Sequence, residues 1–320
     1  MNAPTRLGLY GAGLGVAFVA AFGLSGALVP PSAVTAWAGR AHSQPHGGGD
    51  DMGMGATAHG GDELKGQSLS AHGYVLSPIA APRTPGEQGR LSFRVETTAG
   101  APVTTFATAH DKQLHLVVVR SDGTGYRHVH PTLDTATGTW SIPWAWSAAG
   151  TYRAYADFAT TGSSAQSATL TRAVEVAGSY VPVASTPSRT DTVDGFDVAV
   201  AGDLVAGASS PLTVSVTRDG KPVTTLQPYL GAFGHLVALR EGDLTYLHVH
   251  AEGTAPRAGD VAGPDIAFAA EAPTAGRYLL YLDFQVDGQV HTARFVLDAT
   301  PGAHAGTPGS NSSTDTHSGH

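Results

Sequence analysis

Histidine is the residue type in this sequence whose number and spacing point to chemistry. The 320-residue chain has 15 histidines and no cysteine. His115 is followed by His128 and His130, and because residues i and i+2 of a strand project from the same face, the last two should point the same way. Imidazole nitrogens bind zinc and copper, and three imidazoles on one patch can hold a single ion. The spacing therefore predicts a copper or zinc site.

The same three histidines recur 120 positions later as His235, His248 and His250. Pro102 and Pro222 each begin a stretch of 29 gap-free positions, of which 12 are identical between the two stretches. Internal similarity at a fixed offset is the signature of a repeated structural unit. We therefore predict two copies of one module, each with a metal site on its own β-hairpin.

The turn of the first hairpin decides where its histidines point. Asp122-Gly123 is a strong signal for a two-residue turn. Such a turn pairs Val117 with His128 and places His115 opposite His130, where Cβ atoms are about 4.5–5.5 Å apart. The twin hairpin should likewise place its first histidine opposite its last. The alternative is a five-residue loop, which would send His115 to the other face.

Four more side chains are candidates to bind the ion or to orient its ligands. His110 precedes the first hairpin and is predicted as a fourth ligand there, while His291 opens the last strand and is predicted to serve the second module. Asp157 and Asp283 each follow a tyrosine by two positions. Orienting an imidazole is one role open to a carboxylate, but we expect both to face solvent or to pair with a hairpin arginine.

The elements that must position these residues are β-strands. Short alternating runs separated by Gly, Pro and Asp turns recur in both copies, and no stretch after residue 66 has helical periodicity. Tyr152 and Tyr278 each follow Gly-x, as in the tyrosine corner of immunoglobulin-like folds. The predicted fold class is all-β: two tandem Ig-like or cupredoxin-like antiparallel sandwiches after an N-terminal membrane or signal helix. The predicted segments are 1–38 (signal peptide or anchor), 39–69 (His/Gly/Met-rich linker), 70–178 (first sandwich), 179–191 (linker), 192–299 (second sandwich) and 300–320 (His/Ser/Gly tail).

The N-terminal segment predicts export. Leu7–Val29 is apolar, and its 23 residues are enough to cross a bilayer. Small residues at Ala36 and Ala38 also fit a signal peptide cleaved after Ala38. In both cases the folded part lies outside the cytoplasm. The protein is predicted to be attached to the cell membrane through residues 7–29, or secreted.

The segment between the apolar run and the first strand contains further soft and nitrogen ligands. Its residues are His42, His46, Met52, Met54 and His59. Imidazole and thioether suit copper, and imidazole suits zinc. No spacing here fixes a coordination geometry, so these are predicted as weak ligands in a solvated linker.

Composition and motifs exclude several functions. A net charge of −8 without any cluster of Lys or Arg argues against nucleic acid as a partner. The absence of cysteine excludes disulfides, thiolate zinc sites and iron–sulfur clusters. The sequence has no nucleophile elbow, P-loop, dinucleotide fingerprint or His-Glu-x-x-His motif. We expect a protein that is not an enzyme.

Two segments carry a resemblance to a known group. HDKQLHLVVVR at 110–120 with YRHVHP at 126–131, and YLGAFGHLVALREGDLTYLHVH at 229–250, resemble actinobacterial exported proteins labelled heavy-metal-binding-domain or YtkA-like. The resemblance covers about residues 70–298 and implies tandem β-sandwiches outside the membrane with a metal-related role. Ala251 replaces the proline that follows the second His-x-His, which puts the exit of that hairpin in doubt. Asp122-Gly123 departs from the expected Asp-Leu and affects only the turn.

Two functions of different classes follow. The first is an extracytoplasmic protein that buffers or delivers copper or zinc through its histidine clusters. The alternative is a non-catalytic Ig-like interaction or structural module of the cell envelope, in which the histidines are incidental.

Overall fold

The computed structural model describes residues 66–162 and 165–302. Within these ranges there is no helix long and apolar enough to cross a membrane. The predicted signal or anchor segment, most of the His/Met-rich linker and most of the C-terminal tail lie outside the described residues.

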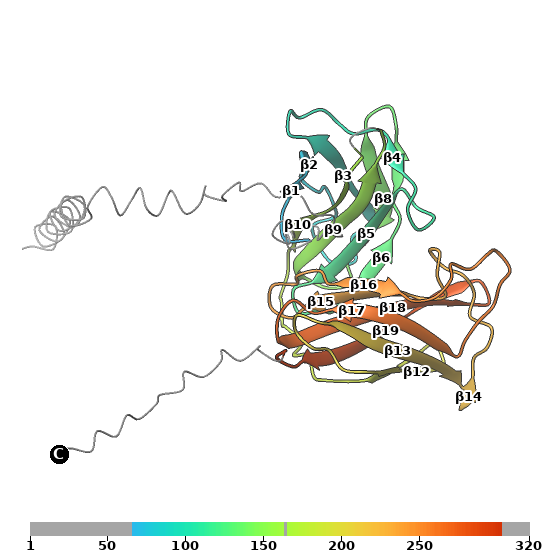
Figure 1. Ribbon diagram of the computed structural model, residues 1–320. Helices are drawn as coiled ribbons and strands as arrows, with labels where there is room; N and C mark the ends of the chain where they lie inside the picture. Colours follow the sequence, from blue (N-terminus) through green and yellow to red (C-terminus); the bar gives the residue numbers. More distant parts are fainter. Residues whose placement is uncertain (1–65, 163–164, 303–320) are drawn as a thin grey trace, which may run out of the picture. The chain divides into compact units, whose positions relative to one another are not determined.

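The first module, residues 70–176, consists of antiparallel strands (Figure 1). Its strands are β1 (Ser70–Ala71), β2 (Tyr74–Leu76), β3 (Gly89–Thr97), β4 (Phe106–Ala107), β5 (Leu114–Arg120), β6 (Arg127–Val129), β7 (Thr132–Asp134), β8 (Thr139–Trp144), β9 (Gly150–Thr160) and β10 (Ser167–Val176). One sheet has the order β1-β2-β3-β8-β7, and the other has the order β10-β9-β5-β6 with β4 on β9. Apart from the short β1 and β4, these orders match the A-B-E-D and G-F-C-C′ sheets of an immunoglobulin-like sandwich.

The second module, residues 190–299, repeats this arrangement with one change. Its strands are β11 (Thr190–Val193), β12 (Phe196–Ala201), β13 (Ser209–Arg218), β14 (Lys221–Pro222), β15 (His235–Arg240), β16 (His248–Ala251), β17 (Asp265–Glu271), β18 (Gly276–Val286) and β19 (Gln289–Ala299). The sheets are β11-β12-β13-β17-β16, with β14 on β13, and β15-β18-β19. The C′ strand is therefore missing from the second sheet. The all-β, tandem Ig-like fold class is confirmed.

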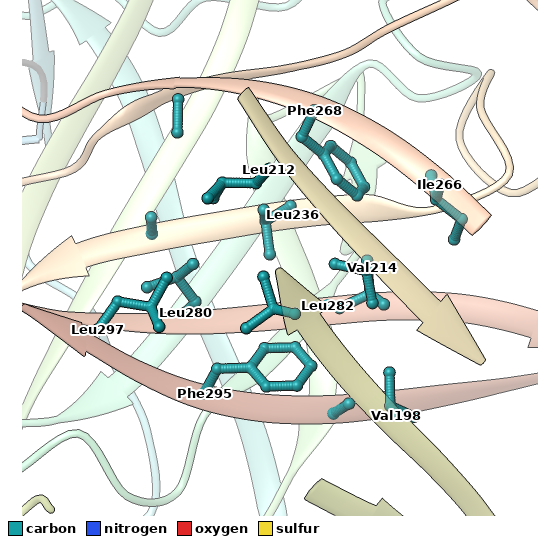
Figure 2. Close-up of a cluster of buried hydrophobic side chains, with 14 of the residues drawn as sticks. Val198, Leu212, Val214, Leu236, Ile266, Phe268, Leu280, Leu282, Phe295 and Leu297 are labelled. Carbon is teal, nitrogen blue, oxygen red and sulfur yellow. The ribbon is translucent and has the colours of Figure 1, made fainter. Parts of the chain in front are cut away.

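Each module has its own core between its two sheets. Alternation along the strands selects the buried face: β12 buries Phe196, Val198 and Val200 and exposes the residues between them. Figure 2 shows the second core, where side chains such as Leu212 of β13 and Leu280 of β18 point toward one another from the two sheets. The first core is built in the same way and includes three tryptophans.

Both predicted tyrosine corners are present. The hydroxyl of Tyr152, near the start of β9, donates to the carbonyl of Ala148 at 2.9 Å. That of Tyr278, near the start of β18, donates to the carbonyl of Thr274 at 2.7 Å. The Gly-x-Tyr pattern thus marked the strand that occupies the F position in each sandwich.

A third hydrophobic cluster joins the two modules. It contains the twin residues Val117 and Val237, Val119 and Leu239, and Tyr155 and Tyr281. The hydrogen bonds are similar, with acceptors one position apart in the repeat: the Tyr155 hydroxyl donates to the Leu244 carbonyl at 2.5 Å, and the Tyr281 hydroxyl donates to the Gly123 carbonyl, whose twin is Asp243, at 2.6 Å. The two C-F-G faces therefore contact each other through equivalent residues, as in a two-fold symmetric interface.

The predicted register of the first hairpin is confirmed. Val117 pairs with His128, with Leu116 opposite Val129 on one side. The turn itself is one residue longer than expected, because the Gly123 amide donates to the Arg120 carbonyl at 2.8 Å and the Arg120 amide donates to the Thr124 carbonyl at 2.9 Å, which makes residues 121–123 the loop. The five-residue alternative is excluded, and His115 lies on the face that the prediction required.

Candidate metal centre

Three imidazoles of the first module converge on one point. His115 lies on β5, and His128 lies on the neighbouring β6, with His130 just after its end. One ring nitrogen from each lies within 4.8 Å of the other two. Nδ1 of His115 is 3.1 Å from Nε2 of His128 and 3.2 Å from Nε2 of His130. The structure thus brings together the three residues that the sequence predicted for this module.

Alternation along β5 turns His115 toward the second module. Leu114, Leu116 and Val118 fill the core of the first sandwich, whereas Val117 contributes to the cluster between the modules. His115 shares the face of Val117, two positions away. The first imidazole of the triad is therefore buried, with 6% of its surface exposed, by the contact between the modules.

Partners on the far side of two rings fix their tautomers. Nε2 of His115 is 3.1 Å from the carbonyl oxygen of Ala109, which can only accept a hydrogen bond, so this nitrogen carries the proton. Nδ1 of His128 is 2.8 Å from Oδ2 of Asp283 and donates to this carboxylate. In the neutral rings, His115 Nδ1 and His128 Nε2 are consequently both unprotonated. Two lone pairs then face each other at 3.1 Å.

Burial keeps these rings neutral. Desolvation, followed by the neighbouring His115, lowers the pKa of His128 to about 3. Desolvation also lowers the pKa of His130 to about 3 and that of His115 below its usual value. Burial raises the pKa of Asp283 to about 6, which leaves it ionised at pH 7. At neutral pH the centre therefore offers unprotonated nitrogens and one carboxylate.

The separation of the nitrogens suits a common ion. Two ligands about 2.05 Å from a tetrahedral zinc ion are about 3.3 Å apart. The observed separations of 3.1 and 3.2 Å are close to that value. A carbonyl or carboxylate that holds the other nitrogen of a ligating histidine is the usual arrangement around protein-bound metals.

Asp283 comes from the second module, and sequence reasoning assigned it the wrong surroundings. It is 2% exposed rather than solvent-facing, and its Oδ1 accepts a hydrogen bond from Thr292 at 2.6 Å. The expected arginine partners bind elsewhere, since Arg120 pairs with Asp122 and Arg240 with Asp243. The error arose because no single-module pattern shows that β18 faces β5 and β6 across the contact.

Its twin Asp157 also does not pair with any arginine of the described residues. Oδ1 of Asp157 accepts from the Thr169 hydroxyl at 2.7 Å, and the residue lies opposite His115 in the ladder between β5 and β9. It is half-buried. The carbonyl of Ala109, which holds His115, was missed entirely because backbone acceptors leave no signal in a sequence.

His235 of the second module joins the cluster of the first. Its ring stacks on that of its twin His115, with centroids 5.9 Å apart and an interplanar angle of 6°. It lies 5.0 Å from the ring of His128 and 6.0 Å from that of His110. The ring of His110 is also 6.1 Å from that of His115. Both His110 and His235 therefore flank the triad without sharing its point of convergence.

The other two histidines of the second hairpin do not follow the prediction. The chain keeps the expected register only as far as Leu247, whose amide donates to Ala238 at 2.8 Å. It then leaves β15, and β16 pairs with β17, so that His250 lies opposite Ala269 rather than His235. The predicted pairing of His235 with His250 is wrong, and His248, opposite Glu271, lies in the same other sheet.

One residue difference accompanies this change. In the first module the chain after His130 continues with Pro131, which has no N–H and cannot donate to a ladder. The corresponding Ala251 lies opposite Phe268 in β16, but its N–H points away from β17, because the amide of the next residue, Glu252, donates to the Ala267 carbonyl at 2.9 Å. The second hairpin therefore exits differently from the first, and the N–H of Ala251 does not explain the difference.

His291 is also not brought to a metal cluster. It pairs with Phe284, whereas Asp283 pairs with both His235 and Thr292, so His291 faces the opposite side of the sheet. Its ring packs against Phe196 and Phe284, with centroids 4.8 and 5.3 Å away, and Nδ1 is 2.8 Å from Asp194. The prediction of His291 as a ligand is replaced by a role in the core. The weak ligands His42, His46, Met52, Met54 and His59 lie outside the described residues.

A cavity of about 280 Å³ adjoins the cluster. His110 and His235 line it on the side of the triad, and His250, Glu252 and Asp265 line it elsewhere. Its apolar wall includes Leu236 and Phe268. The cavity lies where the second hairpin opens, between the start of β15 and the strands β16 and β17.

A comparison with protein families identifies the repeat. A family model described as a domain of unknown function (DUF8832) matches residues 71–176 and again residues 191–301. No curated protein matches the chain.

Three solved structures are similar to this chain at low sequence identity. A chimeric titin Z1Z2-Z1Z2 tandem is 16% identical, with 71% of this chain and 100% of that chain covered, at a TM-score of 0.18. Invasin, a bacterial integrin-binding protein, is 14% identical, with 71% and 39% covered, at a TM-score of 0.21. The Yersinia pseudotuberculosis adhesin InvE is 13% identical, with 72% and 60% covered, at a TM-score of 0.20. These likenesses carry no information about ligands or partners.

Proposed function

This chain belongs to the DUF8832 family, a domain of unknown function, through both of its modules, and we propose that it binds one copper or zinc ion at His115, His128 and His130. The observation that carries the proposal is the pair of unprotonated nitrogens, His115 Nδ1 and His128 Nε2, 3.1 Å apart. Two lone pairs at this distance repel each other unless a cation lies between them. A third nitrogen, from His130, completes the set.

The chain's own residues prepare this site in a specific way. The Ala109 carbonyl and the Asp283 carboxylate hold two of the rings with their lone pairs directed inward. The buried surroundings keep the rings neutral, so an incoming ion displaces few protons at pH 7. Three protein nitrogens leave a fourth position for water or an exchanging ligand, as suits an ion that is taken up and released.

The site of this activity is proposed to be extracytoplasmic, with buffering or delivery of the ion as its role. Support comes from the apolar run at residues 7–29 and from the His/Met-rich segment that follows it. The resemblance to exported heavy-metal-binding-domain proteins agrees with this role. Both copper and zinc suit a three-imidazole set, and copper(II) would bind more tightly than zinc.

The proposal is tested by metal titration of the full chain. Zinc(II) and copper(II) are titrated in competition with a chromophoric chelator, using a chain in which His42, His46, Met52, Met54 and His59 are replaced so that the linker does not contribute. We expect one tight equivalent per chain and a metal-dependent rise in melting temperature. Replacing His115, His128 and His130 by alanine should abolish both.

The second hairpin supplies the matched control. His248→Ala with His250→Ala removes the same tripeptide motif from the other module and should leave the tight equivalent in place. If the wild-type chain binds no tight equivalent, or if the control loses it as completely as the triad variant, the proposal is wrong. The alternative of a non-catalytic interaction or structural module would then remain.

A further inference from the structure

The cavity beside the triad has the lining expected for a cation. Three imidazoles (His110, His235 and His250) and two carboxylates (Glu252 and Asp265) contribute to its wall. No lysine or arginine belongs to this wall in the described part of the chain. Both carboxylate residues are exposed. Carboxylates around an opening concentrate cations and raise their rate of association, while imidazoles bind transition metals.

His110 and His235 stand between this cavity and the triad. The ring of His235 lies 5.0 Å from that of His128 and 5.9 Å from that of His115, while His110 lies 6.0 Å from His235. Neither His110 nor His235 contributes a nitrogen to the convergent set of His115, His128 and His130. Within residues 66–162 and 165–302, the ring of His235 makes no hydrogen bond. Its ring neighbours there are the imidazoles of His110, His115 and His128.

The loop of the second module gives His110 access to the cavity. His110 has a left-handed backbone, with φ of 48°, and its Nδ1 is 3.9 Å from where a Cβ on Gly231 would lie. The ring of this first-module residue thus reaches the loop before β15 in the second module. His110 is exposed, whereas His115 beneath it is buried. A sequence of imidazoles therefore leads from the surface to the buried site.

We infer that this cavity is the port of the metal site, with His110 and His235 acting as transit ligands that pass the ion between the cavity and the triad. The inference rests on the proposed function. In each transfer, one metal–nitrogen bond to the donor imidazole breaks as one to the acceptor imidazole forms, without any change in oxidation state. Glu252 and Asp265 attract the hydrated ion to the opening.

The kinetics of zinc exchange in the full chain test this inference. Transit ligands lower the barrier in both directions, so their loss should change rates far more than the equilibrium. For His235→Asn and for His110→Ala, we expect the association and dissociation rate constants for Zn²⁺ to fall together, by about tenfold, with the dissociation constant changed less than about threefold. His110 is exposed, so its variant keeps the test open if His235→Asn does not fold.

The carboxylates give an independent readout. Glu252→Gln with Asp265→Asn should lower the association rate about threefold at low salt and reduce its dependence on ionic strength. Glu175→Gln with Asp219→Asn, which changes two exposed carboxylates outside the cavity wall, is the matched control and should have neither effect.

The equilibrium and kinetic measurements separate the two proposals. If the wild-type chain does not bind one equivalent of zinc tightly, the proposed function itself is wrong. If it binds zinc but the rate constants of both histidine variants equal those of the wild type, the inference that the ion enters and leaves through this cavity is wrong. If affinity falls because only dissociation accelerates, His235 is a resident ligand, and the transit role is also wrong.

Discussion

The two modules share a sequence pattern but place its last two histidines in different sheets. In the first module, His128 and His130 follow β5 in the C′ position and complete a cluster with His115. In the second module, the same tripeptide belongs to β16 at the edge of the other sheet. The first module thus holds the convergent nitrogens, while the second contributes a carboxylate and a flanking imidazole. A repeat therefore need not mean two sites, because its copies can divide one site between them.

The largest effect should come from replacing, one at a time, the twin aspartates Asp283 of β18 and Asp157 of β9. Asp283→Asn keeps the size of the side chain but removes the charge that holds His128, and affinity for zinc should fall about 10–100-fold. The twin Asp157→Asn should change it less than about threefold. Both values come from chelator competition with the full chain. Equal losses in the two variants would mean that the modules contribute alike.

The next largest difference between the modules should appear at Gly123, which lies at the contact between them. Gly123 has φ of +79°, and a Cβ there would lie 2.4 Å from Cδ1 of Leu279 in the other module. Gly123→Ala should therefore destabilise the chain by about 2 kcal/mol or more, through backbone strain and loss of close packing. Gly242 in the second turn has φ of +99°, and no atom of the described residues lies within 4 Å of where its Cβ would be, so Gly242→Ala carries strain alone. Thermal unfolding should show the larger loss for Gly123→Ala, and equal losses would contradict the close approach.

The hairpin ion pairs should differ in their response to acid. Burial opposes ionisation of Asp122, but hydrogen bonds from Arg120, Val183 and Thr124 prevail and lower its pKa to about 2 from 3.8. Because the folded-state pKa is depressed, this stabilisation is present above pH 3.8 and is lost as the pH falls through about 2. It amounts to about 2 kcal/mol for the side chain that is 4% exposed.

The second module provides the comparison for that acid response. The side chain of Asp243 is 41% exposed, so solvent screens its pair with Arg240, and its contribution should be smaller although its pKa is also about 2. Urea unfolding of Asp122→Asn and Asp243→Asn between pH 5 and 2 measures the difference. If Asp243→Asn reduces the pH dependence of the free energy of unfolding more than Asp122→Asn does, the argument is contradicted.

The smallest expected effect tests the symmetric part of the molecule. Tyr155→Phe and Tyr281→Phe each remove one hydrogen bond to a turn of the other module. Each should cost about 1 kcal/mol of stability, and the two losses should agree closely. Unequal values in urea denaturation would show that the contact is less symmetric than its hydrogen bonds indicate.

Local patterns were enough to predict much of this molecule. Alternation gave the strands, Gly-x-Tyr gave Tyr152 and Tyr278 as corners, and Asp122-Gly123 gave the register that assembles the first triad. These features depend on residues close together in the chain. The errors concern features that do not. Asp283 meets His128 only because two sandwiches pack together, and β16 pairs with β17, a strand of the other sheet, instead of continuing along β15.

The stacking of His115 on its twin His235 has a consequence for how the site is assembled. Equivalent residues that meet across an axis are the geometry of a homodimer, here carried within one polypeptide. Joining the halves makes their encounter intramolecular, so the carboxylate reaches its imidazole at an effective concentration set by the connecting segment. Dilution therefore cannot separate the parts of this centre. The covalent link also allows each half to change without its copy, which a true homodimer forbids.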